Sequence, residues 1–171
     1  MSNGTVAIAG VGATVVLLAC SAFFSSSETA IFTLTPEWIA DQSSTDDARA
    51  ETLQELYDDP HRLLVTLLVG NNVVNIAISS ILTVVVVTYL PTGVAVVATT
   101  LLTSTVVLVF GEIVPKSYGL ANAGRWALTV APAIRVVERV LSPVITVFDW
   151  VTGLIADRIH GESAIEKPYL E

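Results

Sequence analysis

Two long stretches of the chain contain no charged residue, and this segregation of charge limits the folds open to the sequence. No Asp, Glu, Lys or Arg occurs from residue 6 to 27 or from residue 63 to 111. A helix crosses a bilayer with about 20 consecutive apolar residues, and both stretches reach that length. Charged residues make up only 14% of the 171-residue chain, whereas soluble domains carry about 25%. The sequence therefore predicts an all-α membrane protein.

Three transmembrane helices are predicted, at about residues 6–34, 63–90 and 93–118. The turn LPTG between the second and third is short and uncharged, as expected between two antiparallel spans. The first span is not interpreted as a cleaved signal peptide, because no basic residue precedes it.

The basic residues are confined to two parts of the chain, and their placement predicts its orientation. They lie in or beside the loop between the first two spans, or at the end of the third span and beyond it. Cytoplasmic segments of membrane proteins carry the excess of Lys and Arg. We therefore expect a multi-pass protein of the cell membrane, with the N-terminus outside and the C-terminal part in the cytoplasm. The eight basic residues are Arg49, Arg62, Lys116, Arg125, Arg135, Arg139, Arg158 and Lys167.

Shorter helices are expected on the cytoplasmic side of the membrane. The loop at 36–61 reads as one or two of them, with Pro36 at the first helical position after Thr35. After the third span, Pro132 and Pro143 are expected to separate amphipathic juxtamembrane helices that lie at the interface.

Two tryptophans bear on how this C-terminal segment meets the membrane. Trp126 and Trp150 are predicted to anchor it at the interface, where the amphipathic indole ring is favoured. The alternative is a fourth span over residues 140–156, which would place Asp149 in the bilayer.

Charge and composition exclude several classes of function. The net charge of −8 and the lack of a basic patch disfavour nucleic acid as a partner. A single cysteine, Cys20, excludes an internal disulfide and a CxxC metal site. The sequence has no nucleophile–histidine pair and no metal-hydrolase motif, so we predict that the chain is not an enzyme.

Polar groups interrupt the three spans at a similar depth. They form the motifs SSSE at 25–28, GNNVVN at 70–75 and GEIVPK at 111–116. With a rise of 1.5 Å per residue, Ser25 and Glu112 each lie roughly 28 Å from the outer end of their span. Asn71 and Asn75 share one helix face and lie roughly 27 and 21 Å from the outer end of theirs. We therefore expect these groups to meet inside the membrane.

The meeting side chains would offer hydroxyl, amide and carboxylate oxygens, and neither sulfur nor imidazole. Such ligands fit a hard cation, Mg²⁺ or Ca²⁺. Pro115 has no N–H to bond the carbonyl of Gly111, so that carbonyl would be free to bind an ion. A π-type bulge around Glu112 would have the same effect.

Structural roles for the same residues are the alternatives. Glu112 could form an ion pair with Lys116 one turn later, and Glu28 could simply face the cytoplasm. Polar side chains between membrane helices also serve as interhelical hydrogen bonds. That interpretation applies to Asn72, Ser79, Ser80 and residues 99–105. An ionisable group within a span is nonetheless a functional candidate by default.

At these motifs the sequence resembles the transmembrane domain of the CNNM/CorC (CorB) magnesium transporters. FFSSSETAIFTL, LLVGNNVVNIAIS and FGEIVPKSYG occur in this order, and the resemblance covers roughly residues 6–145. It implies a homodimer in the lipid bilayer, with three spans per subunit and a belt of juxtamembrane helices. It also implies export of Mg²⁺ in exchange for Na⁺.

Carried onto this chain, the resemblance implies an intramembrane metal site. Its ligands would be Ser25, Asn71, Asn75, Gly111 and Glu112, with Ser26, Ser27, Glu28 and Gly70 as secondary candidates. Pro115 and Lys116 would be conformational positions. The family continues into cytoplasmic CBS modules that bind ATP, so residues 1–160 would be the transport domain and 161–171 the start of a linker. ATP would then act only through a regulatory domain that this chain lacks.

The expected function is therefore that of a membrane transporter with Mg²⁺ as the transported ion. Mg²⁺ would enter from the cytoplasm and bind the all-oxygen site, where Na⁺ would compete for the Glu112 carboxylate. The rival expectation is a non-transporting Mg²⁺ sensor or membrane scaffold, which would bind the ion without flux.

Overall fold

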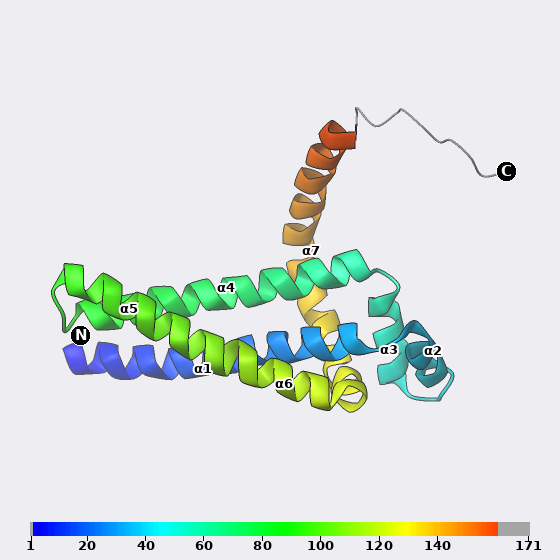
Figure 1. Ribbon diagram of the computed structural model, residues 1–171, viewed down its shortest axis with the longest axis horizontal. Helices are drawn as coiled ribbons and strands as arrows, with labels where there is room; N and C mark the ends of the chain where they lie inside the picture. The colour runs from blue at the N-terminus through cyan, green and yellow to red at the C-terminus, as the bar shows by residue number, and fades with distance from the viewer. Residues whose placement is uncertain (1, 161–171) are drawn as a thin grey trace.

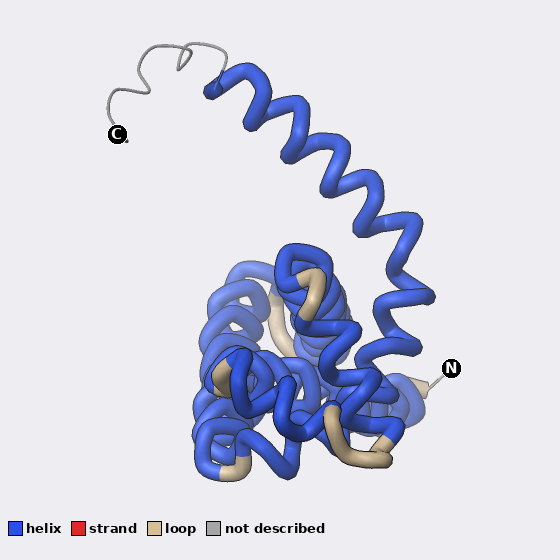
Figure 2. The backbone as a smooth tube through the Cα atoms, turned by 90° about the vertical axis from the view of Figure 1, so that its right-hand side faces the viewer, coloured by secondary structure: helices blue, strands red, loops and turns tan. Residues whose placement is uncertain are grey.

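The computed structural model describes residues 2–160, with side chains at residues 2–148, 150 and 151, and within this part the chain is helical and has no strand (Figure 1, Figure 2). Three helical segments are long and apolar enough to cross a membrane. They are α1 (Asn3–Thr33), α4 (Pro60–Val87), and the run of α5 (Thr92–Val106), η1 (Val107–Ile113) and α6 (Val114–Ala121). The predicted all-α membrane fold with three spans is confirmed.

The three long segments lie side by side, and α1 contacts both of the others (Figure 1). The N-terminus and the α4–α5 turn lie at one end of this bundle, called the turn end below; there the Tyr89 hydroxyl donates to the Asn3 carbonyl at 3.1 Å. The opposite end, called the loop end, carries α2 (Pro36–Ser43) and α3 (Ala48–Tyr57). The Thr35 hydroxyl accepts from the Trp38 N–H and caps α2, so the predicted helix start at Pro36 is confirmed.

The outer surface of the long helices is apolar. Aliphatic side chains such as Ile8, Ile76 and Leu101 are about two-thirds exposed or more. A soluble monomer rarely exposes apolar patches of more than a few hundred Å². An exterior of this kind is stable against lipid chains, in agreement with three membrane spans.

A hydrophobic core fills the loop end of the bundle. It joins the end of α1, the start of α4, both short helices and the first part of α7 (Ala123–His160). This core fixes the short helices against the spans. Its buried members are Phe24, Ala30, Ile31, Ile39, Leu53, Leu56, Leu63, Leu67, Ala127, Val130, Ala131 and Ile134.

Helix α7 is continuous, so the expectation that Pro132 and Pro143 separate two helices is wrong. A proline inside a helix removes one backbone hydrogen bond and clashes with the preceding turn, which can kink the helix without ending it. Both prolines are exposed, whereas Ile134 and Ile145 between and beyond them are fully buried. Packing of that face outweighs the cost of the prolines. Figure 2 shows the C-terminal part of α7 leaving the bundle.

Trp126, predicted to anchor the chain at the interface, has partners inside the protein. Its Nε1–H donates to the Ser26 hydroxyl at 3.0 Å, and its ring meets Tyr118 edge-on at 5.4 Å. Trp150 is exposed. Helix α7 is not among the candidate spans found in the described residues, which gives no support to a fourth span over 140–156. The expected linker at 161–171 lies outside the described residues.

Candidate functional site

A buried hydroxyl on α1 meets two amide groups on α4 in the interior of the bundle. Ser21 is fully buried, and its Oγ lies 3.0 Å from Asn71 Oδ1 and 2.8 Å from Asn75 Oδ1. Asn71 and Asn75 are one helical turn apart and therefore present their side chains to the same neighbour. Ser21, Asn71 and Asn75 together are called the oxygen cluster below.

The oxygen atoms of this cluster can accept more hydrogen bonds than the Ser21 hydroxyl can donate. A hydroxyl group has one hydrogen, so Ser21 cannot form two full hydrogen bonds to the amide oxygens at once. Three oxygen atoms are thus held together with too few hydrogens between them. A hard cation is the ligand that such a convergence of neutral oxygens suits.

The third span approaches this cluster through Gly111. A Cβ atom at Gly111 would lie only 2.7 Å from Ser21 Oγ, so the absence of a side chain lets η1 pack directly against the cluster. Residues Val107–Ile113 are a π-helix, and the following Val114 N–H bonds the Val109 carbonyl five residues back. The π-type bulge considered above as an alternative to the effect of Pro115 is therefore present around Glu112. π-turns inside α-helices occur frequently at functional sites because they release backbone groups from the regular ladder.

Glu112 follows Gly111 and keeps an unpaired carboxylate. It is half-buried and lines a cavity of about 270 Å³ together with Asn75, Thr103 and Ser104. Among the described residues it forms no hydrogen bond and no ion pair. The cavity therefore connects a free carboxylate to Asn75 of the oxygen cluster.

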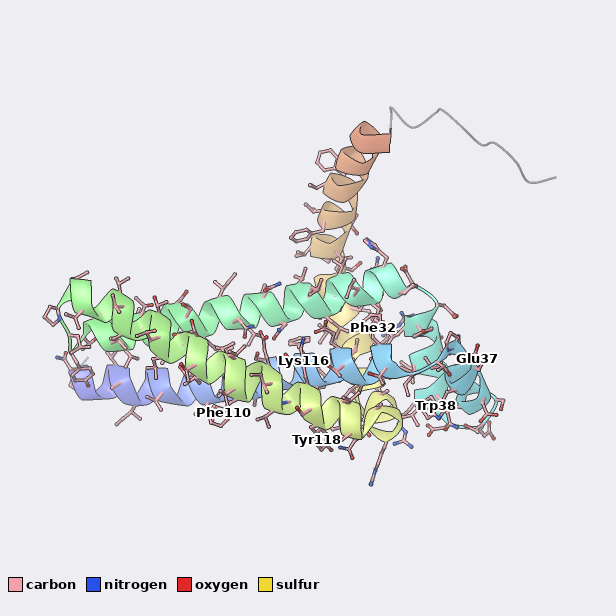
Figure 3. All side chains as sticks on the ribbon, viewed as in Figure 1. Phe32, Glu37, Trp38, Phe110, Lys116 and Tyr118 are labelled. Carbon is pink, nitrogen blue, oxygen red and sulfur yellow. The ribbon has the colours of Figure 1, made fainter. Side chains whose placement is uncertain are left out.

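Lys116 pairs with another glutamate. Its Nζ lies 3.4 Å from Glu28 Oε2, which ties α6 to α1 on the loop-end side of the cluster. Figure 3 shows Lys116 extending from the opposite side of the third span to Phe110 and Tyr118. The alternative that Glu112 is the structural partner of Lys116 is not found. Glu28 takes that role, so it has a structural partner within the protein.

The serines of the SSSE motif differ in how their hydroxyls are satisfied. Ser26 and Ser27 both donate to the Phe23 carbonyl, at 3.1 and 2.6 Å. Ser25 is fully buried, one turn from Ser21, and its Oγ has no hydrogen-bond partner within the described part of the chain. Of the three, Ser25 has the hydroxyl that remains available to a ligand.

Gly70 of α4 also allows a close contact, in this case with the side chain of Phe24 on α1. A Cβ atom there would lie 2.6 Å from the ring of Phe24. Gly70 thereby brings α4 against α1 one residue before Asn71. The structure brings Asn71, Asn75 and Gly111 together. Ion binding by these three residues, and by Ser25 and Glu112, stays a prediction.

Sequence reasoning missed Ser21. The available signal was its spacing of four residues from Ser25, which puts both hydroxyls on one face of α1. Among the side chains that the structure describes, no group of three or more His, Cys, Asp or Glu is placed to hold a metal ion. A metal site here would therefore depend on neutral oxygens and a single carboxylate.

The sequence of this chain matches a protein family and several known proteins. A family profile described as the cyclin M transmembrane N-terminal domain (CNNM) matches residues 12–171. A chloroplastic DUF21 domain-containing protein of Arabidopsis thaliana is 32% identical over 157 residues, which cover 91% of this chain and 23% of that protein.

Two bacterial relatives match this chain at a similar level of sequence identity. The UPF0053 inner membrane protein YfjD of Escherichia coli is 32% identical over 136 residues, 79% of this chain and 31% of that protein. A UPF0053 protein of Haemophilus influenzae is 39% identical over 110 residues, 64% of this chain and 26% of that protein. The chain thus spans less than a third of the length of these relatives.

Proposed function

The chain belongs to the CNNM family of cyclin M transmembrane domains, and from this premise we propose that it exports Mg²⁺ across the membrane through a site formed around the oxygen cluster. Family membership and three membrane spans are consistent with transport of metal ions. The ion, the direction and the exchange for Na⁺ are parts of the proposal.

The observation that carries the proposal is the convergence of Ser21, Asn71 and Asn75 beside the unpaired Glu112. A free carboxylate inside a membrane is costly unless a positive charge neutralises it. The described residues that share its cavity carry no positive charge, and Lys116 on the same span is paired with Glu28. A cation taken up from water would provide the missing charge.

The chemistry of the donor set favours Mg²⁺ over softer ions. Hydroxyl, amide and carboxylate oxygens are hard ligands, and zinc and copper prefer sulfur or imidazole. Mg²⁺ binds through one or two carboxylates and keeps several waters in most protein sites. The 270 Å³ cavity beside Glu112 has room for such waters.

The direction of transport rests on charge distribution. The acidic α2–α3 loop region would raise the local concentration of cations at the loop end, and the positive-inside rule favours a cytoplasmic position for that end. Mg²⁺ would enter there, pass the Glu28–Lys116 pair and reach the cluster. Na⁺ moving inward would occupy the same carboxylate in exchange.

The first test is Mg²⁺ binding by calorimetry to the detergent-purified chain. Wild type is compared with Glu112→Ala and with Glu37→Ala, an exposed glutamate of α2 shown in Figure 3. We expect binding in wild type and Glu37→Ala and its loss in Glu112→Ala. Equal binding by all three proteins would remove Glu112 from the site.

Flux measurements then separate transport from sensing. Vesicles containing the chain and a Mg²⁺ indicator are given a Mg²⁺ gradient, with and without an opposing Na⁺ gradient. A transporter moves Mg²⁺, faster with the Na⁺ gradient, and Glu112→Ala does not. Binding without any flux would indicate the rival function, a Mg²⁺ sensor or membrane scaffold.

A further inference from the structure

Two threonines of α5 are buried and lack the hydrogen bond that nine other threonines of this chain form. The usual arrangement is a hydroxyl that donates to the carbonyl four residues earlier, which satisfies the group within its own helix. The hydroxyls that do so here belong to Thr14, Thr33, Thr52, Thr66, Thr83, Thr88, Thr100, Thr129 and Thr146. Thr99 and Thr103 do not, although their side chains are buried.

The burial of these two hydroxyls makes the missing bonds costly. Thr99 is 4% exposed and Thr103 is 9% exposed, and neither Oγ1 has a partner among the described residues. A buried hydroxyl without a partner loses its hydration and gains nothing in return. Interhelical hydrogen bonding, the structural role that such residues usually have in membranes, is therefore not what these threonines provide.

The position of Thr103 connects it to the candidate ion site. It lines the same 270 Å³ cavity as Asn75 and Glu112, between α4 and the third span. Thr99 lies one turn nearer to the turn end on the same face of α5. The remaining buried hydroxyl without a partner in the described chain, that of Ser25, lies on the loop-end side of the cluster. Unsatisfied hydroxyls thus flank the cluster on both sides.

We propose that this cavity holds a second position for the transported cation, at which Thr103 supplies an oxygen ligand, and that Thr99 continues the path toward the turn end. This inference rests on the proposed transport function. A cation that has given up part of its water needs replacement oxygens at each step through a low-dielectric medium. Thr103 and Thr99 provide them one helical turn apart, about 6 Å along α5.

Glu112 and Asn75 are shared between the two positions. Asn75 contacts Ser21 in the cluster and also borders the cavity, so an ion leaving the cluster keeps one ligand while it gains Thr103. Sharing of this kind lowers the barrier between adjacent sites, because the ion is never without oxygen contacts. The lining is completed by the hydroxyl-bearing Ser104 and by the apolar Val107 and Leu108.

The test compares Thr103→Val, Thr103→Ser and Thr100→Val in reconstituted vesicles. Valine has the shape of threonine without the hydroxyl, and serine keeps the hydroxyl. Thr100 is the matched control, because its exposed side chain is already bonded to the Val96 carbonyl. We expect Thr103→Val to lower the Mg²⁺ flux by about tenfold, as loss of a ligand or supporting group usually does. Thr103→Ser and Thr100→Val should transport like wild type.

Calorimetry on the same variants shows which step is affected. Thr103→Val should bind Mg²⁺ with an affinity close to that of wild type, because the cluster is intact, and should melt at a similar temperature in detergent. Wild-type flux in Thr103→Val, or equal loss of flux in Thr103→Ser, would overturn the second position and leave the proposed function standing. Absence of flux from wild type would overturn both.

Discussion

A single hydroxyl, that of Ser21, links two spans at the candidate site. Its Oγ lies within hydrogen-bond distance of both Asn71 Oδ1 and Asn75 Oδ1. It also lies where Gly111 allows the third span to pack directly against α1. Its contribution can therefore be separated from that of the helices by a small substitution.

We predict that Ser21→Ala weakens Mg²⁺ binding by about tenfold, which is the usual cost of losing a group that orients or ligates a metal. The substitution removes one oxygen and frees the two amides to rotate apart. Calorimetry in detergent measures the change. Ser80→Ala is the control, because its exposed hydroxyl only bonds the Ile76 carbonyl in the same helix. Unchanged affinity in Ser21→Ala would show that the cluster is interhelical packing and not an ion site.

The sequence predicted the depth of the candidate site along the spans better than it predicted which residues form the site. Counting the helical rise along each span predicted that Asn71, Asn75 and the Gly111 region meet, and they do. It selected Ser25 where the bonded hydroxyl is Ser21, one turn away. Such counting is accurate to about one turn, 5.4 Å, because helix tilt and the start of each helix are not visible in the sequence.

At the scale of elements, glycine determines how closely α6 approaches α1. A Cβ atom at Gly119 would lie 2.3 Å from the Ser26 carbonyl oxygen, and backbone cannot move aside as a flexible side chain can. We predict that Gly119→Ala destabilises the protein by about 1–3 kcal/mol, the usual range for overpacking. The melting temperature in detergent, followed by circular dichroism, measures it.

Gly12 provides the matched control for that substitution. A Cβ atom there meets nothing within 4 Å, and alanine is the better helix former by about 1 kcal/mol. Gly12→Ala should leave the melting temperature unchanged or raise it. Equal melting temperatures for Gly119→Ala and Gly12→Ala would mean that α6 does not pack closely on α1.

The start of α3 depends on the ionisation of Asp47. The side-chain hydrogen bond from Arg49, followed by the Arg49 backbone N–H, holds the pKa of Asp47 below its usual value of 3.8. A lowered pKa stabilises the folded helix above that usual value, and this contribution is lost as the pH falls through the lowered pKa. We predict that NMR shifts of the first α3 amides change on acidification below about pH 3.8. Asp47→Asn keeps a capping side chain that does not titrate, and an identical acid response in that variant would contradict the assignment.

The boundaries of the short helices could be read from the sequence, whereas the continuity of α7 could not. Pro36 after Thr35 is a local signal, and the cap formed as predicted. Pro132 and Pro143 are equally local signals for a break, but tertiary packing of the face that carries Ile134 and Ile145 overrides them. The sequence contains no direct indication of which neighbours a helix will find.

At the scale of the whole molecule, an ion-pair network joins three parts of the loop end. Glu138 of α7 binds Arg62 at the start of α4 at 2.5 Å and Arg135 at 3.0 Å, and Arg135 binds Glu55 of α3 at 2.9 Å. The Glu138 side chain is only 8% exposed. This network and the hydrophobic core beside it hold the juxtamembrane helices to the second span.

We predict that Glu138→Gln destabilises the loop end by about 2 kcal/mol. Removing one partner of a buried pair costs about 3–5 kcal/mol, and the figure is reduced here because Arg62 and Arg135 are each about 30% exposed and screened by water. Thermal unfolding in detergent measures the loss. Glu55→Gln is the control: its side chain is 53% exposed, so we expect at most about 0.5 kcal/mol. Since the network lies at the loop end, Mg²⁺ affinity should be the same in both variants as in wild type. A Glu138→Gln variant that melts like Glu55→Gln would show that the hydrophobic core alone holds the juxtamembrane helices in place.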